Sequence, residues 1–369
     1  MPELKAIAYI VAAVGGLCLM GGCKGDSGGT ETTVTKSRHY YQVRSIETFA
    51  DSDRVILGSN TGIEFATLDT ATGALVSDAN YSTQTQPALA GDVIRSVTRS
   101  DDGSYLVVGT NDGISICTLE NERLKVCNDY NDTSIPALPN NNAKDLLLIG
   151  NTLIVGTYHG GVALGHVDPQ TATVASFEIF DVHSLPKLKS PNITSLAINT
   201  SKDIVIVGTA GEGIALAHYD ALSKTIDAIE HISEPTILSD SVQDVAIAPS
   251  GNRVAIATLG GLNIARLENN NTLSVIGSYT RENFIFRQFK RVAFSHDGGR
   301  IAAGTFRFGL MVADLDAQGV LQNYRYLSTY TVPMPSDYIY ALGFNRDGTR
   351  LFVGGGASDT NPVTVIRID

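Results

Sequence analysis

Short hydrophobic runs alternate with polar turns along most of this chain, and the same arrangement returns many times. Each copy contains a short apolar segment, a polar turn, a β-branched segment ending in Gly-Thr or a close variant, and a further apolar segment. Residues 154–162, IVGTYHGGV, show the β-branched segment, its Gly-Thr, a Gly-rich turn and the start of the next segment. Apolar runs of this length, bounded by Gly, Asn and Asp, predict β-strands joined by tight turns.

The repeat occurs seven times. Its marker residue, Gly or Ala, falls at positions 58, 109, 156, 208, 257, 304 and 354. The spacing stays near about fifty residues, the length of one four-stranded propeller blade. A more polar fourth strand follows the third, as in residues 74–81, 173–180, 225–231, 273–279 and 324–327. The pattern therefore predicts an all-β, seven-bladed β-propeller.

The two ends of the repeat array suggest how the ring closes. The seventh repeat runs out of chain after its third strand, whereas residues 39–43 form a β-rich run before the first repeat. Pairing residues 39–43 with residues 363–368 would complete the last blade and remove two exposed sheet edges. We therefore expect this N-terminal run to be the closing strand.

The repeat core, as in Gly109-Thr110-Asn-Asp-Gly113-Ile114, resembles that of two-component-regulator-type propellers. More loosely, it is similar to WD-repeat and lactonase-like seven-bladed propellers. The chain contains no Trp, so it lacks the Trp before Gly-Thr and the Trp-Asp pair of those repeats. The resemblance implies the architecture of residues 38–369, and a shared fold does not by itself imply an activity.

The N-terminus has the pattern of a targeting segment. Lys5 precedes an apolar run over residues 6–20, which suits a secretion signal better than a spanning helix. Leu19-Met-Gly-Gly-Cys23 resembles a bacterial lipobox, which implies cleavage before Cys23 and lipidation of its thiol; an ordinary signal peptide cleaved nearby is the alternative. We expect a signal peptide (residues 1–22), the lipidated Cys23 with a flexible Gly/Ser/Thr tether (residues 23–37), and the propeller (residues 38–369).

From these N-terminal signals we expect the protein to be in the bacterial cell envelope, lipid-anchored at the outer membrane and facing the periplasm or the surface. In an oxidising compartment Cys117 and Cys127, which flank a predicted hairpin, are expected to form a disulfide; two free buried thiols are the alternative. Hydrophobic residues make up 43% of the chain and charged residues 18%, a balance typical of a packed core. The net charge of -11 opposes binding to nucleic acid.

The long connections between blades are where the repeats differ most. They span residues 83–92, 130–142, 181–192, 232–241, 281–288 and 329–337, and five of them contain proline. In a propeller they share one face, here called the loop face, with the turns between second and third strands. Long loops on a rigid scaffold commonly carry binding sites. The alternative is that these loops only cap the rim of the ring.

Two groups of residues on the loop face are candidate binding sites. The first, in the sixth repeat, joins cations to phenylalanines, a chemistry that suits carboxylates, sugars or peptide backbones. It comprises Arg281, Phe284, Phe286, Arg287, Lys290, Arg291, Phe306, Arg307 and Phe308. The second follows from alignment of the first strands and is here called the collar. It comprises Arg44, Arg95, Lys144, Thr194, Gln243, Lys290 and Tyr340.

Because first strands line the channel of a propeller, we expect the collar to surround the channel mouth and to attract an anion or a polar ligand. The alternative is that its cations pair with acids between blades, such as Asp145 and Asp244.

No nucleophile elbow, P-loop or dinucleotide fingerprint occurs, and no histidine pair has metal-ligand spacing. We therefore expect no cofactor and no metal. The Asp-Gly pairs between first and second strands are interpreted as hairpin turns. The favoured function is a non-enzymatic module that binds a protein, a peptide or a glycan. The alternative is a lactonase- or lyase-like enzyme that acts on a small anion at the channel mouth, with His159, Glu212 and Arg95 as candidates.

Overall fold

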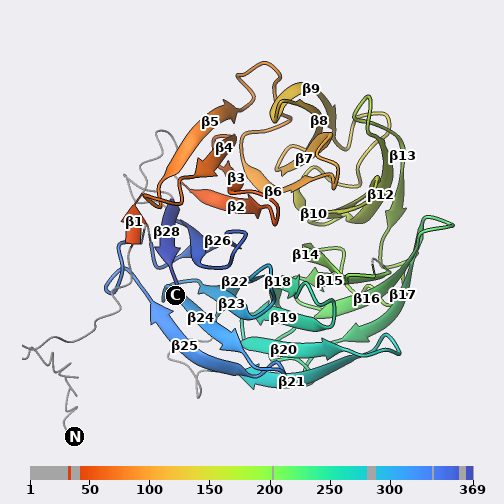
Figure 1. Ribbon diagram of the computed structural model, residues 1–369. Helices are drawn as coiled ribbons and strands as arrows, with labels where there is room; N and C mark the ends of the chain where they lie inside the picture. Colours follow the sequence, from red (N-terminus) through yellow and green to blue (C-terminus); the bar gives the residue numbers. More distant parts are fainter. Residues whose placement is uncertain are drawn as a thin grey trace, which may run out of the picture.

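The computed structural model describes residues 32–34, 42–201, 203–280, 288–334, 336–356 and 363–368. These residues form seven four-stranded antiparallel sheets, arranged as blades around a central axis (Figure 1). No helix occurs among them. The prediction of an all-β, seven-bladed propeller is confirmed.

Each blade places its strands in chain order from the axis outward, with the last blade completed from the N-terminus. The innermost strands are β2 (Val43–Thr48), β6 (Ile94–Arg99), β10 (Ala143–Ile149), β14 (Ile193–Ile198), β18 (Val242–Ile247), β22 (Phe289–Phe294) and β26 (Ile339–Phe344). The second strands are β3 (Arg54–Ser59), β7 (Tyr105–Thr110), β11 (Thr152–Thr157), β15 (Ile204–Thr209), β19 (Arg253–Thr258), β23 (Arg300–Thr305) and β27 (Arg350–Gly355).

The third strands are β4 (Ile63–Leu68), β8 (Ile114–Glu120), β12 (Gly161–Asp168), β16 (Ile214–Asp220), β20 (Leu262–Leu267), β24 (Leu310–Leu315) and β28 (Val363–Arg367). The outermost strands are β5 (Leu75–Tyr81), β9 (Arg123–Tyr130), β13 (Thr173–Phe180), β17 (Thr225–Ile232), β21 (Leu273–Tyr279), β25 (Leu321–Leu327) and β1 (Thr32–Val34). Second strands such as β7 are buried at every residue because both faces of each blade are covered. Outermost strands such as β13 are exposed at most of their residues, which explains their polar composition.

The Gly-Thr marker has a structural role at both of its positions. In blade after blade the Thr hydroxyl caps the turn to the third strand; Thr157 Oγ1 donates to the Gly161 carbonyl at 2.9 Å. The glycine meets the first residue of the next innermost strand, so that a Cβ on Gly58 would lie 2.5 Å from Ile94 Cγ2. The repeat is therefore conspicuous in the sequence because two requirements of blade packing meet at one dipeptide.

The closing strand differs from the one predicted. β28 pairs with β1, with Thr33 opposite Val365, and not with residues 39–43. Val43 instead begins β2, where a Cβ on Gly354 would lie 2.9 Å from Val43 Cγ1. Because Val43 fills the wedge between the last blade and the first, it cannot belong to the outermost strand of the last blade. Residues 32–34 of the expected tether are thus part of the propeller (Figure 1).

Cys117 and Cys127 lie directly opposite each other on β8 and β9 and are joined by a disulfide. The hairpin turns through Asn121 and Glu122, both at positive φ, as a two-residue turn requires. The expected signal peptide and Cys23 lie outside the described residues. Within the part of the chain that the structure describes, no helix has the length and apolar character needed to span a membrane.

Candidate functional site

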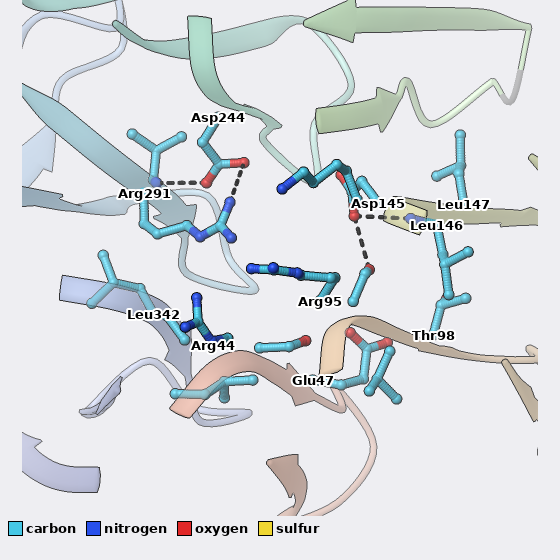
Figure 2. A pocket seen from close by; sticks show the side chains of 17 residues that line it. Arg44, Glu47, Arg95, Thr98, Asp145, Leu146, Leu147, Asp244, Arg291 and Leu342 are labelled. Atoms are coloured by element: carbon cyan, nitrogen blue, oxygen red, sulfur yellow. Dashed lines mark hydrogen bonds and ion pairs between the residues drawn. The ribbon is translucent and has the colours of Figure 1, made fainter. Parts of the chain in front are cut away.

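All seven collar residues line one cavity at the loop-face end of the central channel. The cavity has a volume of about 390 Å³, and Tyr158, Ala210, Ser241 and Arg291 complete its lining. A second cavity of about 310 Å³ shares Arg44, Arg95, Lys144 and Arg291 with it and reaches deeper between the innermost strands. Figure 2 shows the guanidinium groups of Arg44, Arg95 and Arg291 pointing into the same space.

A β-bulge places each collar residue. Every collar residue is the second residue of its innermost strand, and in every blade the pairing with the second strand shifts register there. In β2, for example, Val43 pairs with Ser59 and Ser45 with Gly58, which leaves Arg44 as the extra residue. The same shift occurs around the other collar residues, on β6, β10, β14, β18, β22 and β26. Because a bulge re-aims the extra side chain, the shared register turns seven residues from seven blades to one mouth.

Uncharged neighbours hold the four collar cations. Arg95 Nε donates to Asn111 Oδ1 at 2.6 Å. Lys290 Nζ donates to Gln243 Oε1 at 3.1 Å and lies 4.9 Å from the centre of the Phe306 ring. These contacts orient the cations without neutralising them.

Tyrosine rings hold the other two collar cations. Lys144 Nζ lies 5.1 Å from the centre of the Tyr158 ring. The guanidinium of Arg44 lies 5.5 Å from the centre of the Tyr340 ring and also donates a hydrogen bond to Gln42. Like the partners of Arg95 and Lys290, these neighbours leave the positive charges unneutralised.

The carboxylates of Asp145 and Asp244 make their hydrogen bonds and ion pair with groups other than the collar cations. Asp145 accepts hydrogen bonds from Ser96 Oγ at 2.8 Å and from the Leu196 N–H at 2.7 Å, so it links three adjacent blades. Asp244 accepts from the Val292 N–H at 2.9 Å and lies 3.8 Å from Arg291 (Figure 2). Among the described residues, none of the four collar cations has a carboxylate within ion-pair distance. The alternative, pairing of the collar cations with Asp145 and Asp244, is therefore not what holds them.

Burial and mutual repulsion lower the pKa values of the mouth cations. Burial, then repulsion from Arg291 and Lys144, lowers the pKa of Lys290 to about 7. Burial, then repulsion from Arg95 and Arg291, lowers the pKa of Lys144 to about 8. Burial, then repulsion from Arg44 and Arg291, lowers the pKa of Arg95 to about 10. The mouth thus holds positive charges that destabilise one another, which is the electrostatic condition for attracting an anion.

The deeper cavity is lined by carboxylates as well as by cations. Burial, followed by repulsion from Asp145, raises the pKa of Glu47 to about 8. Burial also raises the pKa of Asp244 to about 6, although Arg291 favours its ionised form. Positive charge is therefore concentrated at the mouth, and groups that tend to hold a proton lie beneath it.

The cluster of cations and phenylalanines in the sixth repeat is only partly within the described residues. Arg281, Phe284, Phe286 and Arg287 lie outside them. Phe306, Lys290 and Arg291 belong to the channel mouth, and Arg291 Nε donates to the Tyr340 carbonyl at 2.7 Å. Arg307 and Phe308 lie in the next turn, on the rim. The structure thus divides the described part of this cluster between the mouth and the rim.

On the rim, Arg307, Phe308 and Tyr338 form what we call the rim patch. The guanidinium of Arg307 lies 5.8 Å from the centre of the Tyr338 ring. A hydrogen bond of 3.0 Å from the Gly309 N–H to the Asp337 carbonyl joins the two segments. Phe308 is 47% exposed and Tyr338 is 37% exposed. Apolar rings from two loops thus face solvent beside an arginine.

The five proline-containing loops are held by buried side chains and by hydrogen bonds. Each proline-containing loop buries an apolar side chain beneath the rim, such as Leu89, Leu138, Leu188, Ile237 and Val332. Side chains close several of the loops, as where Asp337 accepts from the Thr329 N–H at 2.8 Å. The same loops therefore both cap the ring and expose side chains at the rim.

The candidates for catalysis are not brought together. Arg95 lines both cavities, but His159 and Glu212 line neither of them. Among the described residues, no group of three or more His, Cys, Asp or Glu could hold a metal ion. The turn aspartates serve their own hairpins, as where Asp102 accepts from the Ser104 N–H at 2.9 Å.

The alignment of innermost strands did not identify the neighbours of the collar cations. Asn111, Tyr158 and Phe306 each follow the Gly-Thr marker directly. Each donates its backbone N–H to the residue before the innermost strand of its own blade, as Tyr158 does to Asn142 at 3.0 Å. Aligning the repeats at this position as well would have found them.

Comparisons with known proteins identify the fold. No family model matches the chain, and no curated protein matches it. Many solved chains are similar in structure. One is the β-propeller domain of Cps50 (Swd1) from Myceliophteria thermophila, which is 14% identical; the match covers 92% of this chain and 100% of that chain with a TM-score of 0.67. At this identity the likeness shows architecture alone, and the chain has the fold of a seven-bladed β-propeller.

Proposed function

We propose that this protein is a non-enzymatic binding scaffold of the bacterial cell envelope, anchored by a lipid on Cys23, which holds a partner on its loop face. Propellers commonly serve as protein-binding scaffolds, because short conserved strands support variable loops. The observation that carries the proposal is the rim patch. Exposed aromatic rings beside an arginine, on a rigid support, are typical anchors of protein interfaces.

A protein or peptide partner is favoured over a glycan. Phe308 presents a purely apolar ring, which suits an apolar side chain of a partner, whereas sugar recognition needs polar groups around the ring. The loops are already fixed by their own hydrogen bonds and buried anchors, so binding would cost little ordering of the chain.

The test is capture of partners from envelope extracts by the full chain, purified in detergent and immobilised. We expect Arg307→Ala/Phe308→Ala to lose at least about tenfold of the partner that wild type retains, since interface anchors contribute about 2 kcal/mol or more. The control is Leu222→Ala, which removes an apolar side chain, 95% exposed, from the turn between β16 and β17 on the opposite face.

Equal recovery by the rim variant and wild type would remove this surface from the proposal. Protease treatment of the extract should abolish capture, whereas a glycan partner would survive it. The anchor is tested separately: Cys23→Ser should move the chain from the membrane fraction to the soluble fraction.

A further inference from the structure

The channel mouth is a cavity lined by four collar cations that have no carboxylate partner among the described residues. Arg44, Arg95, Lys144 and Lys290 come from four different blades and line one cavity of about 390 Å³. Their contacts with described residues are to aromatic rings and side-chain amides. The ion pairs among the described residues lie elsewhere, apart from Arg291 with Asp244. The protein as a whole is acidic, so this cluster of cations creates a local positive electrostatic potential that favours binding of an anion.

Polar atoms in the cavity wall also lack partners. Arg44 Nε and Thr194 Oγ1 are buried and make no hydrogen bond to any described residue. Both belong to collar residues and therefore lie at bulges that turn them toward the mouth. A buried donor without an acceptor costs about 1–3 kcal/mol, so the site is arranged for a ligand that supplies oxygen atoms.

The cations are pre-organised for such a ligand. Tyr158, Phe306 and Tyr340 lie against Lys144, Lys290 and Arg44, and Asn111 orients Arg95. Contacts of this kind fix a long side chain while leaving most of its hydrogen-bond donors free. Ligand binding would therefore need little reorganisation of the wall.

We infer that the channel mouth binds a compact multivalent oxyanion, a small molecule with at least two phosphate or carboxylate charges. A monovalent anion would leave most of the four cations unmatched, and a cavity of about 390 Å³ cannot contain an extended polyanion. The inference goes beyond the proposed function and does not depend on the rim patch, because the collar and the rim patch share no residue.

Binding of the anion should be coupled to uptake of protons by the protein. Lys290 faces Arg291, Lys144, Arg95 and Asp244, and Lys144 faces Arg95, Arg291 and Arg44. An anion placed among these groups raises the lysine pKa values again. Near pH 8, where Lys290 has lost much of its charge in the empty site, binding takes up protons, and affinity falls as the pH rises from 7 to 9.

The experiment is calorimetric titration of the full chain in detergent, at constant ionic strength in sodium chloride. The probes are citrate, sulfate, inorganic phosphate and acetate. We expect citrate and sulfate to bind at least about tenfold more tightly than acetate. Citrate tighter than phosphate would identify a carboxylate ligand, and the reverse a phosphate ligand. Sulfate, which stays divalent throughout, is titrated at pH 8 in two buffers with different heats of ionisation to measure the proton uptake.

Lys144→Met should weaken citrate binding at least about tenfold, while Lys125→Met, an exposed lysine of β9, should leave it unchanged. Thr194→Asp provides a second test that keeps every cation and should weaken binding similarly. Equal affinity for acetate and citrate, or citrate binding unaffected by both mouth variants, would overturn the inference and identify adventitious binding only.

Discussion

Ile193, the first residue of β14, packs directly against Gly156, the fifth residue of β11 in the preceding blade. A Cβ on Gly156 would lie 2.6 Å from Ile193 Cγ2, closer than side chains in folded proteins approach. The same relationship joins Gly58 to Ile94 and Gly354 to Val43. The glycine of the repeat therefore lies at the packing contact between one blade and the next.

This contact makes a specific prediction for the marker glycine. Gly156→Ala should destabilise the protein by about 2 kcal/mol, since overpacking a tight core typically costs about 1–3 kcal/mol. Gly299→Ala is the matched control, because the atoms nearest to a Cβ there belong to Asp297 and lie at ordinary contact distances of 3.4 Å or more. Chemical denaturation of both variants measures the difference. If the two unfold alike, the glycine is not required by blade packing.

The closing strand predicts where the chain can be shortened. A chain that starts at residue 38 lacks β1 and leaves an edge of β28 unpaired, so it should unfold at least about 4 °C lower and aggregate more readily. A chain that starts at residue 24 keeps β1 and should unfold like the full chain. Thermal unfolding and light scattering compare them. Equal stability of the two chains would show that β1 contributes nothing to ring closure.

In the absence of a ligand, the charged Lys290 side chain should lower the free energy of unfolding. Its pKa is lowered to about 7 in the folded protein and is about 10.4 in an unfolded chain. The unfolded state therefore binds more protons between these values, and wild-type stability rises over that range of pH. In chloride, Lys290→Met should unfold about 2 °C or more above wild type at pH 6, with the difference shrinking toward pH 10. A variant less stable than wild type at pH 6 would contradict this.

The contribution of Glu47 to stability should change with pH in the opposite direction to that of Lys290. Its pKa is raised to about 8 on folding, against about 4.3 in an unfolded chain, so the folded state binds more protons between these values. Wild-type stability accordingly falls as the pH rises from 4.3 to 8. Glu47→Gln mimics the protonated form and should match wild type near pH 4. At pH 9 it should unfold about 2 °C or more above wild type. A constant difference across this range would exclude Glu47 as the titrating group.

Much of the fold could be predicted from the sequence because the repeat is local. Each Gly-Thr dipeptide carries a capping hydroxyl and a close approach in adjacent residues, so seven copies are visible without any knowledge of contacts. The hairpin between Cys117 and Cys127 is local in the same way.

The closing strand was not predictable on these grounds. Thr32–Val34 is short and lies among Gly, Ser, Thr and charged residues, and its pairing is decided by a partner more than three hundred positions away. Val43 had the stronger strand signal, but the wedge against Gly354 places it in the innermost strand of the first blade.

The candidate site shows the same division. Sequence alignment alone determined which seven residues occupy equivalent positions, since the repeat sets their register. Only the tertiary structure decided that bulges turn all seven to one cavity and that Asp145 and Asp244 are already engaged by backbone N–H groups of the following blades. Whether a charge is paired depends on distances across the channel, and those distances arise only when the ring closes.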